Sequence, residues 1–127
     1  DPDYFVFIQE LYGVCEDGAL IDIIVPHHRH DVFLNDPTHK RPITIDGLKL
    51  FSKKWNDICV ENNDGSSKLG HYYNVDFELV NFNFYFDSMY SHLLEDITPE
   101  KEQQIQMMIR QFNNVVVETQ IDLMVVK

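Results

Sequence analysis

The longest run of apolar and aromatic residues lies between Tyr72 and Phe86 and predicts the central strand of the fold. Up to Leu79 the apolar residues alternate with polar ones, a period of two that is typical of a strand with one buried face. From Val80 onward the apolar positions shift by one residue, which in a straight strand would turn them to the opposite face. A β-bulge at Leu79–Val80 would keep both sets on the same side of the sheet. We therefore expect one long, bent aromatic strand over residues 72–86, or two pieces that meet at the bulge.

Apolar residues at three- and four-residue spacing predict several amphipathic helices. The clearest covers residues 46–60, with one apolar face made of Leu48, Phe51, Trp55, Ile58 and Cys59. A helix over 2–12 has Asp1 and Pro2 as suitable N-terminal residues, although residues 4–8 also have strand propensity. Further helices are expected over 89–96 and from Thr98 onward, the second with a buried stripe made of Ile105, Met108, Ile109 and Phe112.

The remaining apolar segments have the pattern of strands. Residues 19–25 form a β-branched run that ends at Pro26, and we expect it to be buried on both faces if Asp22 finds a partner. Residues 42–45 predict a brief strand or a lead-in to the helix that follows, and residues 32–34 either reach into the core or form another short strand. Residues 115–126 alternate over six positions, which favours a strand, with a continuing helix as the alternative.

This order of elements predicts a single α+β domain over residues 1–127. We expect a mostly antiparallel sheet centred on the long bent aromatic strand (72–86), with helices packed on one face. A chain of 127 residues can bury a sufficient core without covalent links. Two cysteines, Cys15 and Cys59, are too few for a disulfide framework and are expected to be reduced.

The net charge of −11 restricts the class of partner. An acidic chain is repelled by nucleic-acid phosphates and by anionic membranes, so neither is expected as a partner. A basic protein is the favoured macromolecular partner. The sequence contains no apolar run long enough to span a bilayer and no signal-peptide pattern at its start. Because both cysteines are expected to be reduced, as in intracellular proteins, we expect a cytoplasmic protein.

A histidine-rich loop is the sharpest candidate for chemistry. Its potential metal ligands lie within a short stretch and are His27, His28, His30, Asp31 and His39. Three protein ligands and an open position suffice for catalytic zinc, so zinc or another divalent metal is a possible cofactor, although no cofactor is required by the rest of the sequence. The spacing matches no established metal motif. A solvated polar loop and a pH-sensing cluster are the alternatives.

Other catalytic patterns are weak, and no catalytic residue is identified. Asp22, with Glu118 and Gln120 on the last strand, gives a weak match to nuclease sites in which carboxylates at strand ends hold Mg²⁺. The chain has neither a nucleophile elbow nor a glycine-rich phosphate loop. Cys15 lies beside Glu16, and a neighbouring acid opposes formation of a thiolate. These patterns leave the question of an enzyme open and favour a protein without catalytic activity.

The favoured interpretation is an acidic protein-binding module, with an inhibitor or immunity-type protein that neutralises a basic partner as its specific form. The residues expected to contact the partner are Asp76, Glu78, Glu95, Asp96, Glu100 and Tyr85. A metal-dependent hydrolase that uses the loop 27–39 is one alternative. A structural subunit of a larger assembly, including a homo-oligomer that associates through the edge of its sheet, is the other.

Overall fold

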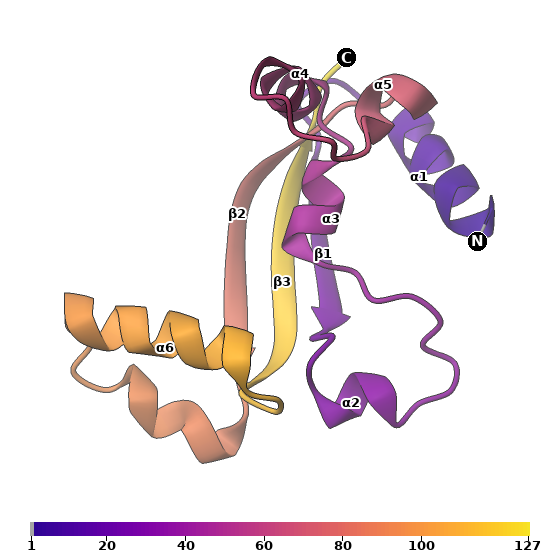
Figure 1. Cartoon of the computed structure of the whole chain (residues 1–127). Helices are drawn as coiled ribbons and strands as arrows, with labels where there is room; N and C mark the ends of the chain where they lie inside the picture. Colours follow the sequence, from indigo (N-terminus) through magenta and orange to yellow (C-terminus); the bar gives the residue numbers. More distant parts are fainter. Residues whose placement is uncertain (1) are drawn as a thin grey trace. The chain divides into compact units, whose positions relative to one another are not determined.

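The computed structural model describes the backbone of residues 2–127 and the side chains of residues 3–127. Three strands form one sheet in the order β1-β3-β2 (Figure 1). The elements along the chain are α1 (Pro2–Val14), β1 (Leu20–Pro26), α2 (Asp31–Leu34), α3 (Ile45–Lys49), α4 (Lys53–Glu61), α5 (Leu69–Tyr73), β2 (Phe77–Phe86), the 3₁₀-helix η1 (Ser88–Leu94), α6 (Pro99–Gln111) and β3 (Val116–Val125). The predicted α+β fold is confirmed.

Backbone hydrogen bonds define the register of the sheet. The amide of Val125 donates to the carbonyl of Ala19 over 2.8 Å, and the amide of Val126 donates to the carbonyl of Asp76 over 2.9 Å. Both pairs belong to antiparallel ladders, as the sequence predicts. Counting along the first ladder places Asp22 on β1 directly opposite Asp122 on β3.

The chain divides into two compact units, each with buried residues of its own. The first unit contains Asp1–Ile23, Ile45–Phe82 and Ile121–Lys127, and the second contains Ile24–Thr44 and Asn83–Gln120. The single domain over 1–127 stays a prediction. The core of the first unit includes Ile8, Leu48, Phe51, Cys59, Val75, Phe77, Ile121, Leu123 and Val125. The core of the second unit consists of Ile105, Ile109, Val115 and Val116, against which Phe84, Phe86, Tyr90 and Leu93 pack.

The aromatic strand begins at Phe77 and not at Tyr72, so the first part of the predicted 72–86 strand is wrong. Tyr72 belongs to α5. The residue that caps the C-terminus of this helix, Asn74, has a left-handed φ of 53°. Asparagine adopts this conformation more readily than most residues, and it terminates the helix before the strand starts. The bulge predicted at Leu79–Val80 is wrong, because the Val126–Asp76 and Asp87–Val115 hydrogen bonds at the two ends of the ladder share one register. Phe77 and Phe84 therefore point to opposite sides of the strand, and Phe84 packs against the core of the second unit.

The helix predicted over 46–60 is interrupted and forms α3 and α4 instead. The carbonyl of Phe51 accepts the amide of Phe77 over 3.1 Å, so it is engaged with the strand rather than with a following helical turn. The side chain of Ser52 then caps α4 by accepting the amide of Trp55 over 3.2 Å. The break therefore joins the helical segment to β2 while Phe51 stays buried.

The strand β1 is confirmed, but burial on both of its faces is wrong. As an edge strand of the sheet it leaves Leu20 70% exposed and Ile24 57% exposed. Of the two alternatives for residues 42–45, the brief strand is wrong and the lead-in is confirmed, because Ile45 is the first residue of α3. Residues 32–34 lie in the short helix α2.

The remaining predicted elements are largely confirmed. The helix α1 continues to Val14, and the C-terminal segment is a strand. The side chain of Thr98 caps α6, as its sequence predicts, but Phe112 lies beyond the helix and is 54% exposed rather than buried. Within the described part of the chain, no helix combines the length and the apolar character needed to cross a bilayer.

Candidate functional site

The first two histidines of the loop lie at the end of β1 and pack against aromatic rings. His27 is only 5% exposed, and its ring stacks on that of His28 with the centroids 4.3 Å apart. It also meets Phe84 edge to face. The Nδ1 atom of His27 accepts the amide of Arg29 over 3.1 Å, so this nitrogen holds the turn that follows the strand.

Burial determines the charge of these two rings. It lowers the pKa of His27 to about 4, and the neighbouring His28, Arg29 and His30 add to the effect by charge repulsion. Burial likewise lowers the pKa of His28, with a further contribution from Arg29. His27 therefore stays neutral at pH 6 and does not contribute to a basic patch at that pH.

His30 links two segments through both of its ring nitrogens. Nδ1 accepts the amide of Val32 over 3.0 Å, which leaves the proton of the neutral ring on Nε2. Nε2 lies 2.8 Å from Oδ2 of Asp87 and donates to it. Asp87 also accepts the amide of Met89, and these hydrogen bonds, above all the one from His30, lower the pKa of its carboxyl group. His30 and Asp87 thus stabilise the starts of α2 and η1.

The other two predicted ligands also have local structural partners. The side chain of Asp31 accepts Nδ2 of Asn114 over 3.2 Å, while its amide donates to the Asn114 side chain over 2.8 Å. The ring of His39 stacks on Phe33, and its Nδ1 lies 3.0 Å from the Phe33 carbonyl. Among the described residues, no group of three or more His, Cys, Asp or Glu side chains is arranged to hold a metal ion. The geometry therefore lends no support to the predicted zinc site, which stays a prediction.

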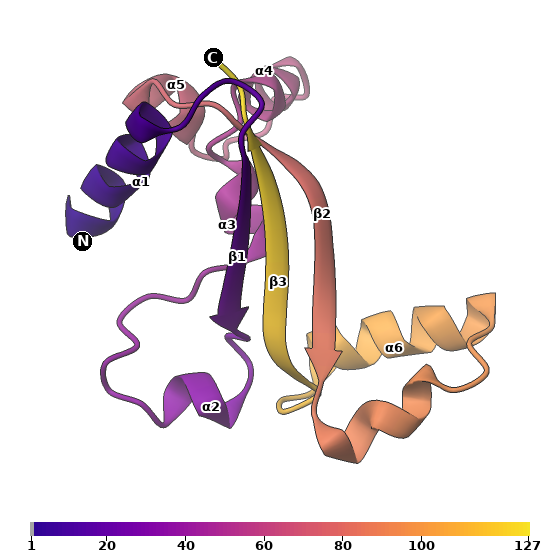
Figure 2. The same cartoon turned by 180° about the vertical axis from the view of Figure 1, so that it is seen from behind.

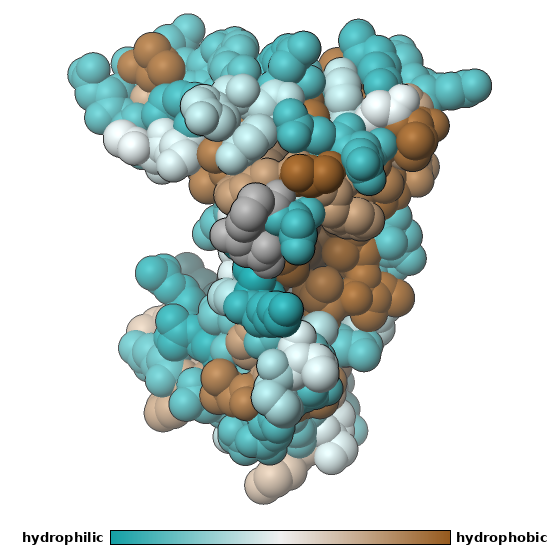
Figure 3. All heavy atoms as spheres, turned by 90° about the vertical axis from the view of Figure 1, so that its right-hand side faces the viewer, coloured by the Kyte–Doolittle hydropathy of each residue, from teal (hydrophilic) through white to brown (hydrophobic). Residues whose placement is uncertain are grey.

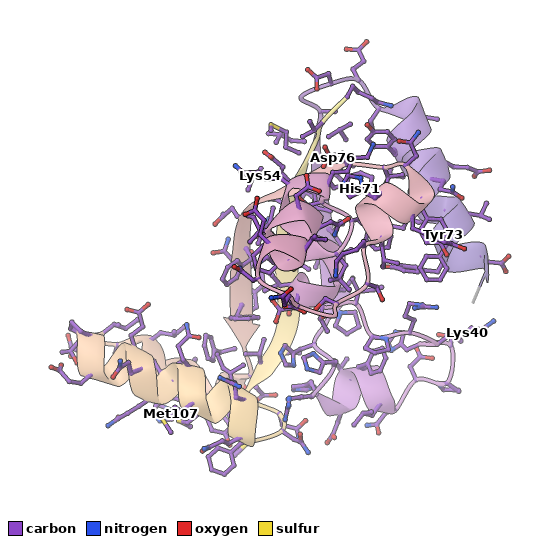
Figure 4. All side chains as sticks on the ribbon, turned by 45° about the horizontal axis from the view of Figure 1, so that its top comes forward. Lys40, Lys54, His71, Tyr73, Asp76 and Met107 are labelled. Carbon is purple, nitrogen blue, oxygen red and sulfur yellow. The ribbon has the colours of Figure 1, made fainter. Side chains whose placement is uncertain are left out.

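Two of the predicted contact acids lie in the first unit. The carboxylate of Asp76 accepts the amide of Lys53 over 3.0 Å and so caps the start of α4. Figure 4 shows Asp76 beside the α4 and α5 helices, near His71. Glu78 is half-buried on β2. Asp76 therefore has a structural role that the sequence did not indicate.

The other four predicted contact residues lie in the second unit. Glu95, Asp96 and Glu100 are exposed between the end of η1 and the first turn of α6. Tyr85 is 47% exposed, and its hydroxyl donates to the side-chain oxygen of Gln120 over 2.8 Å. The predicted set is thus divided between the two units.

Large apolar side chains are exposed along the same two helices. We call this the η1–α6 surface, and its members are the acids Glu95, Asp96 and Glu100 with the apolar residues Met89 (78% exposed), Leu94 (46%), Ile97 (51%) and Met107 (56%). Met107 is labelled on α6 in Figure 4. Figure 3 views the side that carries α1 rather than this surface, and there too hydrophobic side chains lie next to hydrophilic ones. Apolar side chains of this size are found more often in the interior than on a surface.

A pair of carboxyl groups on the sheet escaped the sequence reasoning. Asp22 and Asp122 face each other on β1 and β3, and a side-chain hydrogen bond between them raises the pKa of Asp122. Burial and the charge of Asp22 add to this increase. Such a bond requires a proton on one of the two groups. Sequence alternation alone could place each acid on one face of its strand, but the pairing depends on the register.

A hollow of about 550 Å³ lies beside α3 and α4. It is lined by Asp46, Gly47, Lys49, Leu50, Trp55 and Ser66. The ammonium group of Lys49 lies 3.8 Å from the centroid of the Trp55 ring, where it is attracted to the electron-rich face. The lining combines one acid and one base with no nucleophile–base pair, so it indicates no particular reaction.

Comparisons with protein-family models, with curated proteins and with solved structures found no match to this chain. The assignment of a function therefore depends on the geometry described above.

Proposed function

We propose that this protein is an acidic protein-binding module whose partner is a basic protein. The observation that carries the proposal is the η1–α6 surface, which carries both exposed carboxylates and exposed large apolar side chains. Apolar contacts supply most of the affinity of a protein interface, and charges at its rim select the partner and accelerate association. An inhibitor or immunity-type protein is the specific form that we favour.

The charge of this segment supports a basic partner. Between Glu95 and Glu102 the sequence carries four acids and a single base, Lys101. The ammonium group of Lys101 donates to the backbone carbonyl of Glu95, so it is bound to the backbone rather than to one of these carboxylates. The carboxylates consequently keep a negative potential that attracts positively charged surfaces.

The histidine contacts favour a binding protein over a hydrolase. A general base needs a ring nitrogen that can reach a substrate, and a metal ligand needs one that can reach the ion. In His30 both nitrogens bind protein groups, and in His27 the Nδ1 atom holds a backbone amide. This arrangement is typical of histidines that stabilise a loop.

A charge-reversal experiment tests the proposal. The test variant carries Glu95→Lys, Asp96→Lys and Glu100→Lys, and the control variant carries Glu10→Lys, Glu16→Lys and Glu61→Lys, three exposed acids of the other unit. Both variants have the same net charge. We expect wild type and control to capture the same basic protein from a cell extract, with binding that weakens in high salt, and the test variant to lose it.

Two outcomes would contradict the proposal. Equal capture by both variants would show that the η1–α6 surface is not used, and a captured protein that stays bound at 1 M salt, where the screening length is about 3 Å, would remove the electrostatic argument. If the captured protein is an enzyme, the inhibitor form further predicts that its activity falls to a minimum at an equimolar ratio.

A further inference from the structure

We propose that the open face of the sheet in the first unit docks a basic amphipathic helix of a partner protein, with an arginine or lysine of that helix placed at Asp22 and Asp122. The surface is separate from the η1–α6 surface, and the proposal goes beyond the function given above. We define the open sheet face by the outward residues of three strand segments, which are Leu20 and Asp22 on β1, Glu78, Val80 and Phe82 on β2, and Asp122 on β3.

The two sides of these strands differ sharply in exposure. On the inner side, Phe77 is 1% exposed and Ile121 is 0% exposed, because both belong to the core. On the outer side, Leu20 is 70%, Val80 56% and Phe82 43% exposed. Figure 1 shows α3 in front of the strands, and Figure 2, seen from behind, shows the strands in front of α3, so α3 covers the inner side only.

The register gathers the outer residues into one surface. Asp22 lies opposite Asp122 in the antiparallel ladder of β1 and β3, and the ladder of β3 and β2 places Val80 beside Asp122. Leu20 and Glu78 occupy the next row on the same side. Outward residues of neighbouring strands are close enough to contact one ligand. A polar centre flanked by apolar side chains is the result.

The charges of this surface select a cation. The three strand segments of this unit carry only acids as charged residues, namely Asp22, Glu78 and Asp122, and further along β3 the next charged residue is another acid, Glu118. Two carboxyl groups in contact cannot both ionise readily, and the hydrogen bond to Asp22 raises the pKa of Asp122. A partner cation placed at the two carboxyl groups would offset their mutual repulsion. A guanidinium group can bind two carboxylates at once.

The same charges argue against a second copy of the chain as the occupant. Two copies that met through this face would bring Asp22, Glu78 and Asp122 of each into opposition, and the chain as a whole has a net charge of −11. Helices are the usual cover for an exposed apolar sheet face, because each element buries one side against another layer. A helix with an arginine or lysine inside its apolar stripe therefore fits both the shape and the charge of this surface.

A nuclear magnetic resonance titration tests the proposal on the intact protein. The probe is a synthetic helical peptide with a leucine stripe, a central arginine and lysines at its margins, and the control peptide has neutral citrulline in place of that arginine. We expect amide shifts at residues 20–23, 78–82 and 121–124, and about tenfold weaker binding of the control peptide. Affinity should also fall as the pH is lowered through the raised pKa of Asp122, because the protonated carboxyl group attracts a cation less strongly.

Variants separate this surface from the other one. The variant with Asp22→Asn and Asp122→Asn should bind both peptides equally, whereas the Glu95, Asp96 and Glu100 reversals should bind the arginine peptide as wild type does. If the double variant fails to fold, the pH series on wild type provides the same comparison. Shifts confined to η1 and α6, equal binding of both peptides by wild type, or self-association that protects the face would each overturn the proposal. None of these outcomes decides the partner-capture experiment.

Discussion

The Nε2 atom of His30 lies 2.8 Å from Oδ2 of Asp87, although the two residues are distant in the sequence. Each side chain also accepts a backbone amide at the start of its own helix, Val32 for His30 and Met89 for Asp87. One side-chain pair therefore joins the α2 turn to the end of β2. Its contacts account for His30 as a structural residue of the histidine-rich loop.

Replacement of His30 by alanine should lower the free energy of unfolding by about 1–2 kcal/mol, since it removes a helix cap and the partner of Asp87. Asp87→Ala should also destabilise the protein. The free energy of unfolding should fall less in the double variant than the sum of the two single losses. Urea unfolding at neutral pH measures all three. His92→Ala, on the exposed surface of η1, is the control and should leave the unfolding midpoint unchanged. Strictly additive losses would contradict the pairing.

The protein should lose stability between pH 6.5 and pH 4 through His27. Its pKa falls from 6.5 to about 4 in the folded state, so the fold favours the neutral ring. This contribution is complete above pH 6.5 and is lost as the pH decreases through about 4. The loss amounts to at most about 3 kcal/mol, at 1.36 kcal/mol per pKa unit.

His27→Asn is the variant that tests this dependence, because the asparagine oxygen can still accept the amide of Arg29 while the titration is removed. Urea unfolding at pH 7, 5.5 and 4 should show a smaller loss in the variant than in wild type. His71→Gln, which changes a histidine paired with exposed Asp57, provides the comparison and should retain the wild-type dependence. Parallel curves for wild type and His27→Asn would refute the assignment.

Asp122→Asn should stabilise the protein at pH 7. The hydrogen bond to Asp22 raises the pKa of Asp122 in the folded state, so the stability that this group contributes is present below pH 3.8 and is lost as the pH rises through the raised value. Asparagine resembles the protonated acid and keeps the favourable contact at neutral pH. Thermal unfolding should show a higher midpoint for the variant at pH 7 and no difference at pH 3.

Glu118→Gln is the matched control for this change, because it neutralises an exposed acid on the same strand. With Glu118→Gln, the unfolding midpoint should differ between pH 7 and pH 3 by the same amount as in wild type. If Asp122→Asn and Glu118→Gln have the same effect, general charge repulsion rather than the carboxyl pair explains the result.

Gly70→Ala should destabilise the first unit by about 1–3 kcal/mol, as overpacking does in a closely packed interior. A Cβ atom at Gly70 would lie 2.9 Å from the amide nitrogen of Lys53 and 3.0 Å from the carbonyl carbon of Ser52, and these backbone atoms cannot move freely. Gly13→Ala is the control, since nothing lies within 4 Å of its added Cβ and α1 should gain about 0.5–1 kcal/mol. Urea midpoints that shift equally in both variants would exclude the close contact at Gly70.

The position of Gly70 also explains why the boundary between α5 and β2 was not visible in the sequence. The aromatic residues before Asn74 have strand propensity, but the approach of Gly70 to the start of α4 favours a helical turn there. The interruption after α3 has a similar origin, because the carbonyl of Phe51 bonds to Phe77. Such contacts join residues that local pattern reasoning treats separately.

The sequence by itself determined the elements whose signals are local. The period-two alternation of β3, the Thr98 cap of α6 and the acidic net charge are all readable from neighbouring residues, because propensity, capping and charge act over a few positions. Only the tertiary structure decided which residues meet. Strand register placed Asp22 against Asp122, and loop packing placed His30 on Asp87. The physical reason is that these partners are chosen by long-range hydrogen bonding and burial, for which one chain read in order carries no local signal.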